Sequence, residues 1–158
     1  MKSLPALFGR ATLCGALCLA TGLAFAGECP ADKRVADGKG QKAGATMPSG
    51  VTDVVRASTD LAKEPAAIKG RQFRLRQLDL QPGGVVPWHS HNDRPAMIYI
   101  VSGEVEEYAS NCAVPILHKE GEIRPEVKGT SHWWENKGAK TVILYVGDIL
   151  HDKDDHNM

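Results

Sequence analysis

The residues best suited to chemistry in this sequence are three histidines in two short stretches. His89 and His91 are one residue apart within residues 83–104, and His132 lies within residues 121–136. If the first stretch is extended, both of its imidazoles project from the same face. Neutral imidazole is the commonest protein ligand for transition metals. The pattern therefore indicates a metal site if the two stretches meet in space. The competing interpretation is a pair of surface histidines beside a loop.

The first residues have the organisation of a secretory signal peptide. A positively charged start is followed by an apolar run at residues 13–25, and Ala24-Phe25-Ala26 forms an A-x-A cleavage site before Gly27. We therefore predict that residues 1–26 are removed and that the mature protein is periplasmic or secreted. The apolar run is shorter than the roughly 20 residues of a membrane span, so no stable span is expected after cleavage. The alternative interpretation is an uncleaved N-terminal anchor.

The charge balance argues against polyanionic partners. The sequence has 19 Lys and Arg residues and 19 Asp and Glu residues, and loss of Lys2 and Arg10 with the signal peptide leaves a slight negative excess. The remaining basic residues are scattered among acidic ones. A nucleic-acid footprint or a polybasic membrane patch needs clustered positive charge. We expect neither of these, and the expected partner is a small-molecule ligand.

Two of the four cysteines would remain in the mature protein. Cys14 and Cys18 lie in the apolar run and leave with it, whereas Cys29 and Cys112 stay. An even pair in an oxidising compartment predicts a disulfide. The alternative interpretation is a free Cys112 thiol near the metal site.

Short apolar segments separated by glycine turns run through the rest of the chain. We interpret residues 27–70 as an irregular N-terminal arm and a first strand at 51–61, residues 71–150 as one barrel domain, and residues 151–158 as a polar tail. Strands recur at hairpin spacing, and no convincing amphipathic helix is present. This pattern favours an antiparallel sandwich or a small barrel.

One predicted strand, residues 72–80, changes phase along its length. Its apolar alternation slips by one residue after Leu75, and a β-bulge would account for the slip. A turn is expected next, at Pro82-Gly83-Gly84.

The two histidine stretches resemble the two sequence motifs of the cupin superfamily. The first motif, G(x)5HxH(x)3-4E(x)6G, is matched by Gly83, His89, His91 and Gly103. The second motif, G(x)5PxG(x)2H(x)3N, is matched by Gly121, Gly129, His132 and Asn136. The resemblance covers residues 72–149. It implies an all-β fold, a double-stranded β-helix or jelly-roll barrel, in which His89, His91 and His132 share one metal ion in the interior.

The chain departs from the first motif at its fourth ligand. The two allowed spacings place the family's glutamate at Pro95 or Ala96, and neither side chain binds a metal. Three interpretations remain: a site of three histidines, which some metal-dependent cupins use; a ligand role for Asp93 or Glu104; or loss of the metal. The proline of the second motif is replaced by Val127, which is a minor change.

A site of three neutral imidazoles leaves a divalent ion with its full charge, so it favours anionic or chelating ligands. It also polarises a carbonyl or lowers the pKa of bound water. We expect iron or zinc, then copper, then manganese. One hypothesis is a metalloenzyme of dioxygenase, isomerase or hydrolase type. The alternatives are a non-catalytic periplasmic cupin that binds a metal or small ligand for sensing, storage or delivery, and a metal-free structural barrel.

Several residues outside the three-histidine set also have expected structural or binding roles. Trp134 shares a strand face with His132, so it walls a pocket or packs in the barrel. Arg94 is the other candidate for the pocket, where it would pair with an anionic substrate. The alternative is that Arg94 is a solvated arginine in a loop. Asn136 is expected to make a turn hydrogen bond. The remaining histidines are interpreted as surface residues: His118, His151 and His156. Because cupin barrels often pair through their sheets, the resemblance also implies a homodimer.

Overall fold

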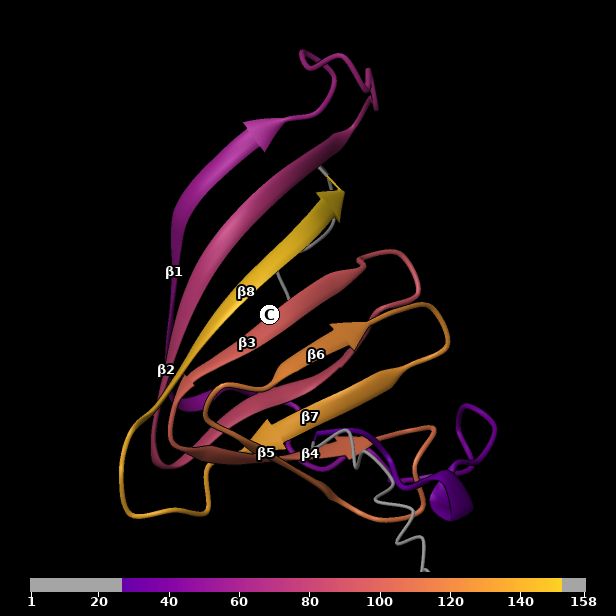
Figure 1. Cartoon of the computed structure of the whole chain (residues 1–158), viewed down its shortest axis with the longest axis vertical. Helices are drawn as coiled ribbons and strands as arrows, with labels where there is room; N and C mark the ends of the chain where they lie inside the picture. The colour runs from indigo at the N-terminus through magenta and orange to yellow at the C-terminus, as the bar shows by residue number, and fades with distance from the viewer. Residues whose placement is uncertain (1–26, 152–158) are drawn as a thin grey trace, which may run out of the picture.

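The computed structural model describes residues 27–151, which form a curled antiparallel sheet (Figure 1). The predicted signal peptide, residues 1–26, and the tail beyond His151 lie outside the described residues. Apart from a short 3-10 turn, η1 (Ala31–Lys33), the described elements are strands: β1 (Ser49–Asp60), β2 (Arg71–Ser90), β3 (Ala96–Ser102), β4 (Glu104–Ala109), β5 (Ile116–Lys119), β6 (Ile123–Glu126), β7 (Ser131–Glu135) and β8 (Val142–His151).

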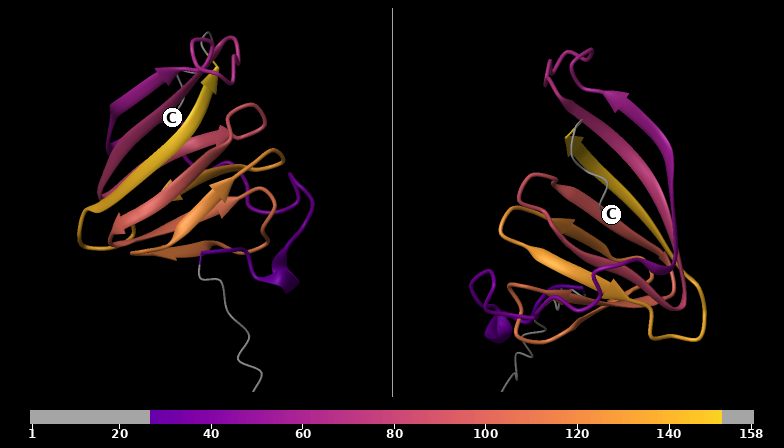
Figure 2. Two further views of the ribbon diagram at one scale, coloured as in Figure 1. Left: turned by 45° about the horizontal axis from the view of Figure 1, so that its top comes forward. Right: turned by 180° about the vertical axis from the view of Figure 1, so that it is seen from behind.

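The long strand β2 joins the two halves of the sheet. Its first half pairs with β8 and its second half pairs with β7, both antiparallel, and the strand order is β5-β4-β7-β2-β8-β3-β6 with β1 beside β2. The sheet therefore folds over on itself, with β7, β4 and β5 curling beneath β8, β3 and β6 (Figure 2). This arrangement confirms the predicted all-β double-stranded β-helix.

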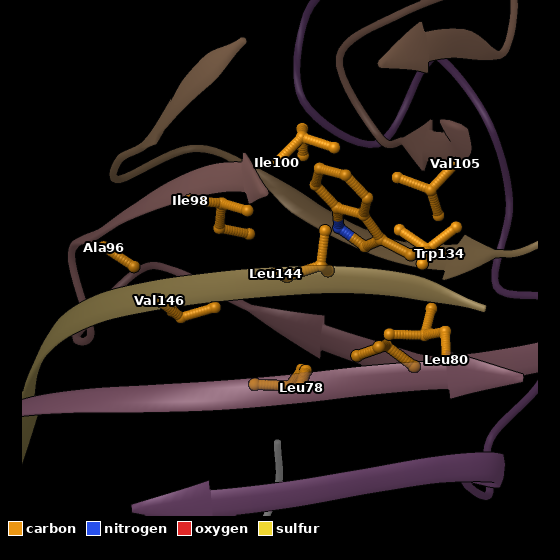
Figure 3. Packing of buried hydrophobic residues seen from close by; sticks show 11 residues of the cluster. Leu78, Leu80, Ala96, Ile98, Ile100, Val105, Trp134, Leu144 and Val146 are labelled. Atoms are coloured by element: carbon orange, nitrogen blue, oxygen red, sulfur yellow. The ribbon is translucent and has the colours of Figure 1, made fainter. Parts of the chain in front are cut away.

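The core fills the space between the two halves. Figure 3 shows the indole of Trp134, on β7, among aliphatic side chains from β2, β3, β4 and β8. Eleven buried side chains form this cluster: Leu78, Leu80, Val86, Ala96, Ile98, Ile100, Val105, Trp134, Val142, Leu144 and Val146. Because successive strand residues alternate between faces, the same geometry directs every second residue of β2 and β7 inward.

The predicted β-bulge at residues 72–80 is wrong. This part of β2 pairs with β8 in unbroken register, and the register shift lies in β1, between Val55 and Ala57. Phe73 and Leu75 are on the exposed face, and the inward positions before Leu78 are taken by arginines. The apolar alternation slips because charged side chains occupy two interior positions, not because the backbone changes phase.

The predicted turn at residues 82–84 is also wrong, because β2 continues through it. The chain does not reverse there, although the pairing with β1 skips from Leu80 to Val85. Gly83 has φ +74°, and a Cβ on Gly84 would lie 2.6 Å from the carbonyl oxygen of Gly50. Glycine is therefore needed at both positions, one for its backbone angle and one for space.

Asn136 makes the predicted turn hydrogen bond and also holds this part of β2 in place. Its side chain is fully buried. The amide nitrogen donates to the carbonyl oxygens of Leu80 (2.9 Å), Gln81 (3.1 Å) and Lys140 (2.8 Å), and the amide oxygen accepts from the backbone N–H of Gly138. The two N–H groups of this amide are therefore shared among three carbonyl oxygens, and one side chain links β2 to the turn between β7 and β8.

The N-terminal arm is bound along the connection between β4 and β5. A disulfide joins Cys29 to Cys112, as predicted, so the alternative of a free Cys112 thiol is wrong. The backbone of Gly40 donates to Ser110, and that of Val35 donates to Asn111. With a sequence separation of 83 residues, such a bridge contributes about 3–4 kcal/mol in the chain-entropy account. No helix within residues 27–151 is long and apolar enough to cross a membrane.

Replacing Asn136 by alanine is expected to destabilise the fold by about 3 kcal/mol, because it strands three carbonyl oxygens and one N–H at a buried site. Equilibrium unfolding in urea measures the change in the free energy of unfolding. Lys137→Ala, in the same turn, removes an ammonium that is 53% exposed, and it should cost less than about 1 kcal/mol. Equal costs for the two substitutions would contradict the role given to Asn136.

Candidate metal centre

Three imidazoles converge in the barrel interior. The register of β2 and β7 places His89 opposite His132, and His91 follows β2 directly. The three Nε2 atoms lie 3.0 Å apart for His89 and His91, 3.0 Å for His91 and His132, and 3.2 Å for His89 and His132. The structure therefore brings the three predicted ligands together. His91 and His132 are buried and His89 is half-buried.

The opposite nitrogen of each ring is fixed by a hydrogen bond. Nδ1 of His89 donates to the carbonyl oxygen of Pro87 (2.8 Å), Nδ1 of His91 to that of Arg94 (2.7 Å), and Nδ1 of His132 to the Glu107 carboxylate (2.7 Å). Because carbonyl and carboxylate oxygens only accept, each Nδ1 carries a proton. The Nε2 atoms are then left to face one another, and they need a cation between them.

A fourth donor, Glu126, completes the cluster. Its side chain lies at the end of β6 and is 1% exposed. One oxygen is 2.7 Å from Nε2 of His91. The other is buried without a hydrogen-bond partner among the described residues and lies 3.1 Å from Nε2 of His132. The donor atoms of His89, His91, Glu126 and His132 all lie within 4.8 Å of one another. A carboxylate beside three imidazoles is a typical donor set for a divalent transition metal.

The sequence interpretation missed Glu126 and named two other carboxylates. Asp93 pairs with Arg71 at the surface, and Glu104 is 59% exposed, so neither joins the cluster. Glu126 is instead the direct cross-strand partner of Ala96 in the pairing of β3 with β6. Directly opposed side chains have Cβ atoms about 5 Å apart. The carboxylate therefore stands one strand away from the position where the cupin motif places its glutamate.

A buried carboxylate supports His132 from behind. Glu107, on β4, is fully buried and accepts from His132 through one oxygen and from Nε2 of His118 (2.9 Å) through the other. Arg124 lies 3.2 Å from the same carboxylate. His118 is 0% exposed, so its interpretation as a surface histidine is wrong. Ile116 and His118 are the inward positions of β5.

The electrostatics of the cluster favour a cation. Burial lowers the pKa of His89 well below its ordinary value, and the neighbouring His132 and His91 lower it further, so this ring stays neutral. Burial alone would raise the pKa of Glu107, but hydrogen bonds from His118 and His132 hold it below the ordinary range. Burial opposes charge on His132 too, yet the carboxylates of Glu126 and Glu107 raise its pKa. The carboxylates beside His132 therefore favour a cation at this cluster.

The donor spacing fits a six-coordinate ion. For metal–nitrogen bonds of about 2.1 Å, adjacent donors lie about 3.0 Å apart around an octahedral ion and about 3.4 Å apart around a tetrahedral one. The observed separations of 3.0–3.2 Å between Nε2 atoms lie nearer the octahedral value. An orphaned carboxylate oxygen and three unprotonated nitrogens at this spacing match what a metal ion requires.

A small cavity of about 20 Å³ lies beside the donors and opens to solvent, with room for about one water molecule. Three of the four candidate donor residues reach its wall, which is otherwise apolar except for one arginine, Arg76. The lining residues are Arg76, Leu78, Val86, His89, His91, Ile98, Glu126, Trp134, Leu144 and Val146. Trp134 therefore serves as both core and pocket wall. Its ring packs edge-on against His132 and stacks on His118.

The arginine in the cavity wall belongs to a buried ionic cluster. Asp148, on β8, accepts two hydrogen bonds from Arg74 (3.0 and 2.7 Å) and lies 3.3 Å from Nε of Arg76. Arg76 also pairs with Asp53. Arg94 is 5% exposed and lies 4.0 Å from Asp148, so the alternative of a solvated loop arginine is wrong. Arg94 also presents its carbonyl oxygen to His91.

Comparison with known proteins agrees with this geometry. A family model described as "Cupin domain" matches residues 76–148. Auxin-binding protein ABP19a of Prunus persica is 26% identical over 99 residues, which cover 60% of this chain and 47% of that protein. The chain therefore spans about half the length of the curated relatives that it matches.

Solved structures share the fold at low sequence identity. A predicted oxalate decarboxylase from Thermotoga maritima superposes with a TM-score of 0.54 at 18% identity, covering 78% of this chain and 98% of that one. A conserved protein from Klebsiella pneumoniae with a double-stranded β-helix domain gives 0.51 at 20% identity, covering 68% and 84%. At such identities the likeness establishes the fold alone.

The position of the carboxylate can be tested by moving it. Glu126→Ala should lower the affinity for a divalent metal at least tenfold, because it removes a ligand and its charge. The double variant Ala96→Glu, Glu126→Ala returns a carboxylate to the same space from the neighbouring strand, and it should recover most of the loss. Metal titration of the refolded, metal-free protein measures both effects.

The matched control is Glu104→Gln, which changes an exposed carboxylate and should leave metal affinity unchanged. A Glu126→Ala protein that binds metal as tightly as the parent would show that this carboxylate is not a ligand.

Proposed function

Because this chain belongs to the cupin superfamily, we propose that it is an exported metalloprotein that holds one divalent transition-metal ion. The ligands are His89, His91, Glu126 and His132. The ion and the adjoining cavity bind a small anionic, chelating molecule, and the protein acts on it as a metalloenzyme. The observation that carries this proposal is the convergence of four donor atoms, three of them from residues that line a cavity whose remaining charged side chain is Arg76.

Charge balance favours an anionic ligand. Three guanidinium groups, those of Arg74, Arg76 and Arg94, lie in the interior with the carboxylates of Asp53 and Asp148. With Glu126 and the pair of Glu107 and Arg124 added, the buried positive and negative charges cancel. A divalent ion would then leave an excess of about two positive charges in a water-poor space, where charge interactions are strong. A mono- or dicarboxylate relieves this excess by binding the ion and facing Arg76.

The donor set changes the expected order of metals. Among first-row ions, imidazole suits iron, zinc and copper, and carboxylate suits manganese. The spacing favours a six-coordinate ion, so we place iron or manganese ahead of zinc and copper. When bound, such a metal supplies Lewis acidity and redox chemistry to a ligand held in its open positions.

The cavity wall narrows the reaction class. Besides the metal ligands and Arg76, its described lining residues are apolar, so no separate side chain is placed to carry protons as general acid or base. Isomerase and hydrolase chemistry that needs such a group is disfavoured. Dioxygenase chemistry on a small chelating carboxylate is the class that the site fits best, because O₂ is then the oxidant, both of its atoms enter the product and no side chain has to supply a proton. Arg76 would fix one end of the carboxylate, and the apolar wall would exclude water.

The same lack of an acid or base supports a second candidate, a binding protein without turnover. The curated relatives from Prunus persica are named auxin-binding proteins, which is consistent with small-molecule binding by this fold. Export to the periplasm or outside the cell is supported by the A-x-A site and by the disulfide of Cys29 with Cys112. A homodimer stays a prediction.

The role of Arg76 predicts a separation between metal binding and ligand binding. Arg76→Lys keeps the charge that offsets Asp148 but loses the planar fork that pairs with a carboxylate. The metal-loaded variant should keep its metal and bind small carboxylates about tenfold more weakly, since one charge-assisted hydrogen bond is worth roughly 1.5–3 kcal/mol. Calorimetry with oxalate, glycolate and catechol as probes measures this, and product analysis of the same mixtures tests turnover.

Arg56→Lys is the matched control, because Arg56 is hydrogen bonded to Gln77 on the exposed face. It should leave both affinities unchanged. If no probe binds the metal-loaded parent, the proposed ligand class is wrong; binding without product would favour the second candidate.

A further inference from the structure

Within the described residues, 27–151, one buried nitrogen behind the candidate metal centre has no hydrogen-bond partner. His118 is 0% exposed, and its Nε2 donates to Glu107, which in turn accepts from the metal ligand His132. The other ring nitrogen, Nδ1, is buried and unpaired. An unsatisfied buried polar atom is costly, so this nitrogen indicates a partner that approaches from the far side of His118.

Gly27 lies at that side. A Cβ built on Gly27 would fall 2.9 Å from Nδ1 of His118 and 2.5 Å from Oε2 of Glu122. Since a Cα–Cβ bond is about 1.5 Å long, both atoms lie within about 4.5 Å of the Gly27 Cα. A side chain at position 27 would therefore have to displace the His118 ring or the Glu122 carboxylate.

The surroundings of Gly27 suit a cation. Oε2 of Glu122 lies 3.9 Å from Nδ1 of His118, and the Glu122 side chain is only 13% exposed. A partly buried carboxylate and an unpaired ring nitrogen therefore lie next to the same backbone. An ammonium group, with three donors and a positive charge, satisfies both acceptors.

Gly27 is also the residue that follows the predicted cleavage site, Ala24-Phe25-Ala26. Hydrolysis of the Ala26–Gly27 peptide bond by a signal peptidase consumes one water, leaving a carboxylate on Ala26 and an α-ammonium on Gly27. In the uncut chain the same nitrogen is a neutral amide with one N–H. Cleavage therefore creates a cation beside Glu122 and His118.

We propose that removal of the signal peptide completes the metal centre. The α-ammonium of Gly27 pairs with Glu122 and donates to Nδ1 of His118, which fixes His118 with its Nε2–H toward Glu107. Glu107 then accepts a hydrogen bond from Nδ1 of His132, which leaves Nε2 of His132 for the metal. His118 and Glu122 are thus positioning residues. This inference rests on the proposed function, because it requires both export and a metal at His132.

The experiment uses the full chain, exported to a bacterial periplasm with its own leader, and first establishes the N-terminal residue by intact mass. The parent should begin at Gly27. Two variants disturb the contact: Glu122→Gln, and an alanine inserted between Ala26 and Gly27, which moves the α-ammonium one residue away. Both should lose metal to a competing chelator roughly three- to tenfold faster than the parent. This is less than the 10–100-fold typical of a direct partner of a metal ligand, because the contact acts on His132 through His118 and Glu107.

Glu120→Gln, an exposed carboxylate in the same turn, is the matched control and should release metal at the parental rate. The pKa of the Gly27 α-ammonium, followed by NMR, should be higher in the parent than in Glu122→Gln. An N-terminus other than Gly27, or variants that hold metal as long as the parent does, would overturn the inference. A parent that begins at Gly27 but binds no metal overturns the proposed function, and the α-ammonium pKa then still decides whether the contact exists.

Discussion

The structure depends on keeping three imidazole nitrogens within 3.2 Å of one another inside a barrel. Lone pairs at this distance repel unless a cation lies among them. The protein holds them there by donating every Nδ1–H to a fixed acceptor, two of which are backbone carbonyls within three residues of the histidine in sequence. The third acceptor, Glu107, is itself held by His118 and Arg124. Much of the buried polar structure therefore serves to orient one donor set.

The carboxylate of Glu126 lies on a different strand from the one that carries the glutamate in the cupin motif. Position 96 points inward beside His91, and so does its partner on the adjacent strand, Glu126. A cross-strand pair presents two side chains to nearly the same point, so either strand can supply the ligand. The donor set is then defined by a point in space and not by one position in the motif. The missing motif glutamate consequently does not imply a missing metal.

The sequence predicted well whatever depends on local spacing. The short strands, the histidine pair and the structural role of Asn136 all follow from residue types at fixed separations. The buried arginines and the roles of Glu126 and His118 were not predicted, because they depend on pairing between strands that are distant in sequence. The inward arginines of β2 are compatible with burial because Asp148, about seventy residues later, lies opposite Arg74. Glu126 and His118 sit on strands of four residues, too short for alternation to reveal which side faces inward.

The most direct test of the central claim is anomalous diffraction from crystals of the exported protein loaded with Fe(II) or Mn(II). The account predicts one anomalous peak at bonding distance from Nε2 of His89, His91 and His132 and from a carboxylate oxygen of Glu126, with Nδ1 of His132 still bonded to Glu107. A peak elsewhere in the molecule, or a metal bound with Glu126 turned away from it, would contradict the account.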